Sequence, residues 1–288
     1  MWIPSSFLYA IFDSLQNVYY KKTDLQINPI LMAWSVLVIS SLFFLPLLFL
    51  GIPHLNISFW ISVFARLIID SVAFVLFIKG VQKSPLSLTI PMTSLSPILS
   101  IGTVFLVSHL LPSTLGFVGI IITVGGLYFL NFDHDTKHLL SPFRAVFKEK
   151  GVLMVAVASI LWSIVSALQK LGIDNSNTYF YTAFFQIFWA ICFTPVAYFA
   201  DKKGFMSMFN FKSVKIFLPS GVLDSIKTIA QNYAYAFSIP AYVNSIGNTG
   251  IIFSSLFGAI FFKEKIKNHI IPIMIIFIGL TFIVFGQR

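Results

Sequence analysis

The sequence predicts an all-α polytopic membrane protein, with ten transmembrane helices arranged as two inverted five-helix repeats. Of the 288 residues, 57% are hydrophobic and only 10% are charged, whereas a soluble domain carries about 25% charged residues. Polar breaks divide the chain into apolar segments close to the roughly 20 residues that cross a bilayer. Matching residues also recur at a nearly constant spacing in the two halves.

The ten predicted spans are bounded by Pro, Gly, Asn and charged residues. The turn at Ser238-Ile239-Pro240 carries no charge, but the uncharged run from Thr228 to Phe262 is too long for one helix, and proline ends a helix naturally. The predicted spans are 2–20, 28–50, 58–80, 86–108, 113–131, 151–171, 177–200, 214–237, 241–262 and 269–286.

The repeat is visible as pairs of similar residues. Ser14 and Pro46 match Ser163 and Pro195, each 149 residues later, and Pro85 and His109 match Pro240 and Glu264, each 155 residues later. One six-residue insertion in the loop 201–213 accounts for the change in spacing. We therefore divide the chain into a first repeat, 1–132, a polar linker, 133–150, and a second repeat, 151–288. Five spans per repeat make the second repeat enter the membrane from the opposite side, as in many secondary transporters.

The basic residues predict the orientation. Of the 19, 15 lie in or beside the odd-numbered loops, Lys170 and Arg288 lie on the even side, and Arg66 and Lys227 lie inside spans. Because positively charged loops stay in the cytoplasm, the odd loops are expected inside and both termini outside. The same reasoning assigns the net charge of +9 to membrane topology, not to nucleic-acid binding.

Charged residues inside spans are costly and usually mark function. Arg66 and Asp70 are four residues apart in the third span, and Asp224 and Lys227 are three apart in the eighth, so each pair lies on one helix face. One interpretation is a midplane cavity, where Arg66 or Lys227 receives a carboxylate or phosphate, and an aspartate receives an amine or a coupled proton. The alternative is that each pair neutralises itself and holds the bundle together.

A second set of candidates comes from the first and sixth spans. Asp13 has no cation one turn away on its own helix, and Asn17 lies on the same face. At the spacing of 149 these residues correspond to Trp162 and Ser166, which predicts a polar and aromatic face suited to a small organic substrate. The alternative is a neutral, hydrogen-bonded Asp13 that packs two helices.

Polar residues also gather late in the eighth span and early in the ninth. Gln231 follows Lys227, and Asn244 and Asn248 stand among small residues that could let backbones approach closely or expose carbonyls to a ligand. Span four begins similarly, around Pro91 and Pro97, and kinks at matched places suggest a moving gate. The predicted substrate-binding residues are Asp13, Asn17, Arg66, Asp70, Trp162, Ser166, Asp224, Lys227, Gln231, Asn244 and Asn248.

Catalytic and metal sites are not expected. His134 and His138 in the linker could be imagined as metal ligands, but a solvated loop is the simpler interpretation. The sequence has no HExxH, Walker or GxSxG motif, and it has a single cysteine. We therefore predict a protein that is not an enzyme and has no cofactor.

The tails of the two halves, from Pro85 and from Pro240, resemble the EamA family of the drug/metabolite transporter superfamily. In that pattern a span ends in an acidic residue with a basic neighbour, and a glycine-containing final span follows. Glu264, Lys265 and Gly279 match in the second half, whereas His109 replaces the acidic residue in the first, where Gly116, Gly119, Gly125 and Gly126 fit. The resemblance implies ten helices in two inverted repeats, a central cavity and alternating access, often for amino acid export.

The expected function is therefore a secondary transporter that exports amino acids or related small metabolites. The alternatives are a translocator of nucleotide sugars, sugar phosphates or lipid-linked substrates, and a membrane interaction protein without transport. The expected partners are a small-molecule substrate, membrane lipid and a coupled proton, but no nucleic acid. The expected location is the cytoplasmic (inner) membrane, and the chain is expected to be a monomer or a homodimer.

Overall fold

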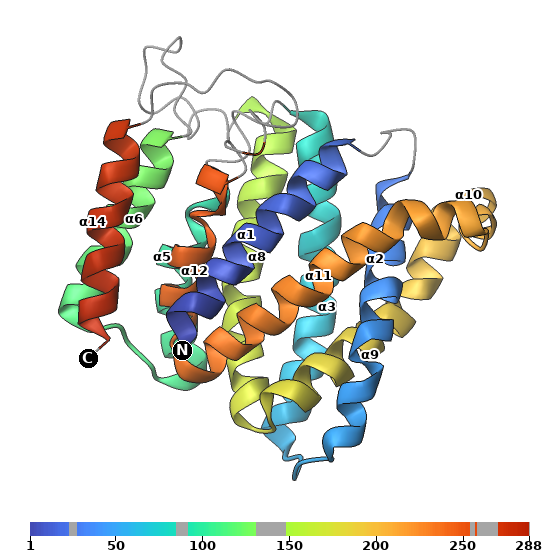
Figure 1. The fold of residues 1–288 in the computed structure, drawn as a ribbon, viewed down its shortest axis with the longest axis horizontal. Coiled ribbons are helices and arrows are strands. Elements are labelled where there is room, and N and C mark those ends of the chain that lie inside the picture. The colour runs from blue at the N-terminus through green and yellow to red at the C-terminus, as the bar shows by residue number, and fades with distance from the viewer. Residues whose placement is uncertain (23–27, 85–91, 131–147, 254–256, 258–269, 288) are drawn as a thin grey trace.

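The computed structural model describes residues 1–22, 28–84, 92–130, 148–253, 257 and 270–287, and this part of the chain contains helices and connections but no strand (Figure 1). The first half contains α1 (Trp2–Lys22), α2 (Pro29–Phe44), the 3-10 helix η1 (Leu45–Leu50), α3 (Ile57–Lys83), α5 (Ser96–Ser108) and α6 (Thr114–Leu130). The second half contains α8 (Lys150–Asp174), α9 (Thr178–Ala200), α10 (Lys202–Ser207), α11 (Phe211–Phe237), α12 (Pro240–Gly247) and α14 (Ile270–Gly286). The all-α prediction is confirmed for these residues.

Several of these helices have the length and composition of membrane spans. Among the described residues, four are long and apolar enough to cross a bilayer, namely Pro29–Leu50, Ile57–Phe77, Lys150–Asp174 and Thr178–Ala200. Three shorter apolar helices are Ser96–Ser108, Thr114–Phe129 and Ile271–Gly286. The predicted linker 133–150 falls largely outside the described residues, as do His134, His138, Pro85, Glu264 and Lys265.

Asparagine side chains begin equivalent helices in the two halves. Asn28 accepts a hydrogen bond of 3.0 Å from the backbone of Ile30 at the start of α2, and Asn177 accepts one of 2.8 Å from Phe180 at the start of α9. Asn56 and Asn210 cap α3 and α11 in the same way. An asparagine before a helix satisfies a backbone N–H group that has no partner within the helix. The two halves therefore share their asparagine caps as well as their order of helices.

The helices of the two halves interlock. α1 packs extensively against α11, and its counterpart α8 packs most extensively against α3, the counterpart of α11. α2 packs against α9, and α6 against α14. Every one of these pairs joins one half to the other, so the core is shared and neither half encloses a core alone.

The connections gather at two ends of the bundle. Both chain termini lie at one end, where α11 finishes and α3 begins, and we call it the terminal end (Figure 1). α3 and α11 therefore run in opposite directions. At the other end, where α1 and α3 finish and α8 begins, the exposed lysines include Lys79, Lys83, Lys148 and Lys150. The charge asymmetry predicted for the loops is thus present between the two ends of the described helices.

Two helices are interrupted at matched places. The predicted ninth span, 241–262, is not one regular helix, because α12 ends at Gly247 and Asn248 and Thr249 form a turn before helical structure resumes at Gly250. In the first half a turn at Ser94 and Leu95 precedes α5. The Thr249 hydroxyl donates to the carbonyl of Ile246 at 2.6 Å, and such local bonds compete with the helical ladder. The two interruptions meet where Asn248 Nδ2 donates to the carbonyl of Thr93 at 3.5 Å.

Candidate functional site

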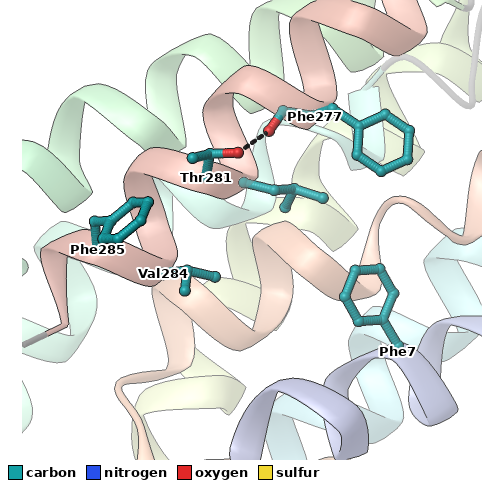
Figure 2. A pocket seen from close by; sticks show the side chains of 6 residues that line it. Phe7, Phe277, Thr281, Val284 and Phe285 are labelled. Carbon is teal, nitrogen blue, oxygen red and sulfur yellow. Dashed lines mark hydrogen bonds between the residues drawn. The ribbon is translucent and has the colours of Figure 1, made fainter.

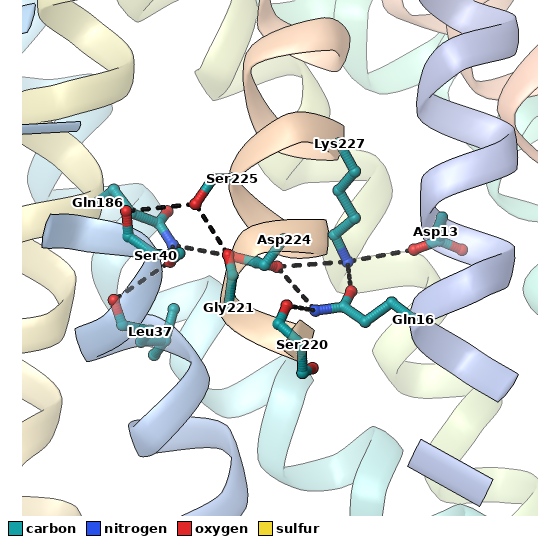
Figure 3. A network of polar contacts seen from close by, with 10 residues as sticks. All are labelled: Asp13, Gln16, Leu37, Ser40, Gln186, Ser220, Gly221, Asp224, Ser225 and Lys227. Carbon is teal, nitrogen blue, oxygen red and sulfur yellow. Dashed lines mark hydrogen bonds and ion pairs between the residues drawn. The ribbon is translucent and has the colours of Figure 1, made fainter. Parts of the chain in front are cut away.

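Lys227 is the centre of a charged network between α11 and α1 (Figure 3). Its Nζ donates to Asp13 Oδ1 at 3.1 Å and to Gln16 Oε1 at 2.5 Å, both on α1. On its own helix it lies 3.5 Å from Asp224 Oδ1. The predicted pairing of Asp224 with Lys227 is therefore present, but Lys227 is shared with a second carboxylate from the other half of the chain.

Asp224 is also held by neutral amides. Gln16 Nε2 donates to Asp224 Oδ1 at 3.3 Å and to the carbonyl of Ser220 at 3.2 Å. On the other side, Gln186 Nε2 of α9 donates to Asp224 Oδ2 at 3.2 Å and to Ser40 Oγ of α2 at 2.8 Å. Amide donors stabilise a buried carboxylate without adding charge. Asp224 therefore connects four helices, α1, α2, α9 and α11.

Arg66 and Asp70 form a second charged cluster on α3. Arg66 Nε lies 3.4 Å from Asp70 Oδ2, and Trp162 Nε1 of α8 donates to Asp70 Oδ1 at 3.1 Å. The guanidinium carbon lies 3.8 Å from the ring centre of Phe185, and Nη1 donates to the Tyr181 hydroxyl at 3.4 Å. Stacking on an aromatic face suits the planar, weakly hydrated guanidinium.

The two clusters belong to one central region. Their helices, α3 and α11, both pack against α8 and α9. Consecutive residues of α9 also link them, since Phe185 stacks with Arg66 and Gln186 binds Asp224. The five side chains Asp13, Arg66, Asp70, Asp224 and Lys227 include three carboxylates and two cations. As ionised groups they leave one formal negative charge, which favours a cationic group or a proton.

Accessibility distinguishes the members of this network. The side chains of Arg66 and Asp70 are 8% and 7% exposed, and that of Asp224 is 12% exposed. Those of Asp13 and Lys227 remain 32% and 23% exposed, although both take part in the network. Asp13 and Lys227 are therefore the charged groups that a ligand can reach most directly.

Amides and a tyrosine form a third group near the terminal end of α11. Tyr235 donates to Asn244 Oδ1 at 2.5 Å and accepts from Gln231 Nε2 at 3.2 Å. One turn away, Asn232 donates to Thr182 at 2.8 Å and accepts from Gln169. These bonds join α11 to α12, α9 and α8.

The structure thus brings most of the predicted residues into contact networks. Asp13, Asp224 and Lys227 form one, Arg66, Asp70 and Trp162 another, and Gln231 and Asn244 a third, while Asn248 lies at the meeting of the two helix interruptions. Ser166 is not part of any of these networks. It is buried, and its hydroxyl donates to the carbonyl of Ser163 on its own helix. The side chain of Asn17 lies outside the described part of the chain.

Five residues of the two charged clusters were not among the predictions. They come from α1, α2 and α9, and all five are buried: Gln16, Ser40, Tyr181, Phe185 and Gln186. Gln16 and Gln186 had a signal in the sequence, since an amide inside an apolar span needs a polar partner. Which partner each amide meets depends on how α1 and α9 pack.

Two cavities lie away from the charged residues. One, of ≈ 210 Å³, lies between α1 and α14 and is lined by Phe7 and by α14 residues that include Phe277, Thr281 and Phe285 (Figure 2). The other, of ≈ 350 Å³, lies at the terminal end between Pro112, Tyr242 and Gln287. Neither contains a charged side chain. We therefore place the candidate site at the charged networks, where the chain has accessible groups that can bind a polar molecule.

Comparison with known proteins agrees with this architecture. The model of the EamA-like transporter family matches residues 1–132 and 149–285, which is one match in each half. No curated protein matches the chain. A solved structure, described as the crystal structure of a protein, shares 12% identity with a TM-score of 0.72, over 99% of this chain and 97% of its own. At that identity the likeness shows the fold alone. The EamA-like transporter family consists of integral, multi-pass transporters of the drug/metabolite transporter superfamily.

Proposed function

Because the chain belongs to the EamA-like transporter family, we propose that it is a secondary transporter that exports amino acids or related small metabolites by alternating access. The observation that supports this substrate class is the pair of charged clusters on α3 and α11, which present cations and carboxylates in one central region. A zwitterion needs both kinds of group, at two ends of one small site.

Arg66 is the proposed partner of the substrate carboxylate. Its guanidinium has five N–H groups, and among the described residues only two of the guanidinium nitrogens make hydrogen bonds, each 3.4 Å long. Its stacking on Phe185 fixes the plane of the group without using these donors. Arginine binds carboxylates through two parallel hydrogen bonds, so an incoming carboxylate improves on both of the present contacts.

Asp13 is the proposed partner of the substrate ammonium, or of a coupled proton, because it is the most accessible carboxylate of the network. In α3 the cation precedes the carboxylate, and in α11 it follows, while the two helices run in opposite directions. Both cations therefore lie on the terminal-end side of their carboxylate partner. This order favours a substrate whose carboxylate points toward the terminal end.

We propose that the interruptions before α5 and after α12 move during transport. They lie at matched positions of the two halves and touch through Asn248 and Thr93. In the ten-span, inverted-repeat arrangement that we propose, rocking of one half against the other changes the contact between them. A turn tolerates such a change better than a regular helix does, since fewer backbone hydrogen bonds must break.

The test is counterflow in proteoliposomes. Vesicles loaded with one unlabelled amino acid at a time are diluted into the same labelled compound, and uptake is compared with that of sugar phosphates, nucleotides and lipid head groups. Uptake of one or more amino acids is expected. R66K and D13N should reduce uptake at least tenfold, whereas D174N should preserve it, because Asp174 pairs with Lys170 outside the network at 2.6 Å.

Counterflow of sugar phosphates alone would show that the protein is a transporter whose substrates are sugar phosphates and not amino acids. Absence of counterflow for every class, with a thermal shift on lipid head groups, would favour a lipid-linked substrate. Equal uptake by wild type, R66K and D13N would show that the charged clusters hold the bundle together and do not bind substrate.

A further inference from the structure

The oxygens around Lys227 have the arrangement of a binding site for an ammonium ion. Three acceptors, Asp13 Oδ1, Gln16 Oε1 and Asp224 Oδ1, lie 3.1, 2.5 and 3.5 Å from its Nζ. A primary ammonium group has three N–H donors and no acceptor, so it matches three converging oxygens from two helices. We define these three side chains as the ammonium seat.

We propose that Lys227 is a built-in competitor, which occupies the ammonium seat until the ammonium group of a substrate displaces it. This inference rests on the proposed function, and it assigns the substrate class as primary amines, including amino acids. Lys227 then has two roles: it neutralises the seat when no substrate is bound, and it rejects compounds that carry no ammonium group.

The seat is built to remain an acceptor. Gln16 Nε2 and Gln186 Nε2 donate to the two oxygens of Asp224, so neutral amides fix the carboxylate from two sides. The amide of Gln16 is oriented by the same bonds, because Nε2 also donates to the carbonyl of Ser220 and thereby turns Oε1 toward Lys227. These contacts do not depend on Lys227, and they persist when another ammonium group takes its place.

The seat can be approached from outside while Lys227 occupies it. Its side chain is 23% exposed, and that of Asp13 is 32% exposed, so a ligand can approach the seat without first opening the buried part of the network. The lysine has a flexible four-carbon stem.

Chemical rescue tests the proposal. K227A removes three methylene groups and the ammonium, which together correspond to propylammonium. In the purified full-length protein, K227A is expected to melt below wild type, and propylammonium should raise its melting temperature saturably. Propanol, which has the same length and no charge, should not. K170A is the matched control, because Lys170 is likewise a lysine paired with a carboxylate, that of Asp174, but lies outside the seat.

A second variant pair tests the seat itself. D13N in the K227A background should weaken the apparent affinity for propylammonium about tenfold or more, since a hydrogen bond to a charged group contributes at least about that factor. D174N in the same background should leave it unchanged. If K227A does not fold, K227Q is tested with methylammonium, because the shorter neutral side chain leaves room for a one-carbon ammonium ion.

Each outcome decides the question. Equal stabilisation of K227A and K170A by propylammonium, or equal effects of propanol and propylammonium, would overturn the proposal. Equally strong rescue in the K227A/D13N double variant would show that Asp13 is not part of the ammonium seat. If rescue fails but amino acids show counterflow, the role proposed for Lys227 is wrong and the proposed function stands. If rescue succeeds but no metabolite shows counterflow, the ammonium site is real and the proposed function is wrong.

Discussion

Ser14 of α1 donates its hydroxyl hydrogen to the carbonyl of Gly250, at 2.5 Å, where helical structure resumes after the interruption at Asn248 and Thr249. A second bond between the halves, of 2.7 Å, runs from Thr103 of α5 to the carbonyl of Ser163 on α8. Ser163 is the repeat partner of Ser14. In both places a hydroxyl group crosses from one half to the other and binds a backbone carbonyl within the bundle.

Replacing Ser14 by alanine should destabilise the contact between α1 and the segment after α12. The carbonyl of Gly250 loses the donor from α1, and interhelical hydrogen bonds in membranes contribute about 0.6 kcal/mol on average and up to about 1.7. The free energy of unfolding in detergent should fall by about this amount. S5A is the control, since Ser5 is only partly buried and its hydroxyl makes an exposed bond to the Met1 carbonyl on its own helix. Equal effects of S14A and S5A would contradict the assignment.

Glycines on α6 can be separated into packing and non-packing positions. A Cβ added at Gly119 would lie 2.7 Å from the carbonyl oxygen of Gly279 on α14, whereas one added at Gly125 would meet nothing within 4 Å. G119A should therefore force α6 and α14 apart and lower the melting temperature. G125A should be neutral or slightly stabilising, because alanine favours a helix over glycine by about 1 kcal/mol. A thermal-unfolding comparison of the two variants is sufficient, and similar losses would argue against this helix pairing.

Arg66 and Asp70 should show strong energetic coupling. Removing one partner of a buried ion pair costs about 3–5 kcal/mol, because it leaves an uncompensated buried charge. R66M should therefore destabilise more than the double variant R66M/D70N. The corresponding cycle at Lys170 and Asp174 should give a coupling below about 1 kcal/mol, since the Asp174 side chain is 40% exposed. Chemical unfolding of the wild type and of the two single variants and the double variant of each pair measures both couplings. Equal values would show that Arg66 and Asp70 are solvated.

The orientation of the chain can be measured with introduced cysteines. Cys192 is the single cysteine, so C192S provides a clean background. The substitution H54C is at an exposed position at the terminal end, before α3, and S207C is at an exposed position of α10. Because the lysine-rich end should face the cytoplasm, an impermeant maleimide should label H54C in intact cells and S207C only after permeabilisation. The reverse pattern would invert the predicted topology.

Local features of the fold could be predicted residue by residue. The break before Pro240 is present, since α11 ends at Phe237 and α12 begins at Pro240. The pairing of Arg66 with Asp70 also follows from helical spacing alone. By contrast, the early end of α12 at Gly247 was not predicted, because the polar residues early in the ninth span do not reveal that Thr249 bonds locally to Ile246.

Composition and helical periodicity determined the helical fold, the two matched halves and the position of each charged pair, because these depend on neighbours along the chain. Only the tertiary structure decided that Lys227 joins Asp13 to Asp224, and that Gln186 and Phe185 bring the two clusters together. These contacts cross between helices more than 30 residues apart. Their partners are set by how α1, α9 and α11 pack side by side, and helical spacing within one segment carries no information about a neighbouring helix.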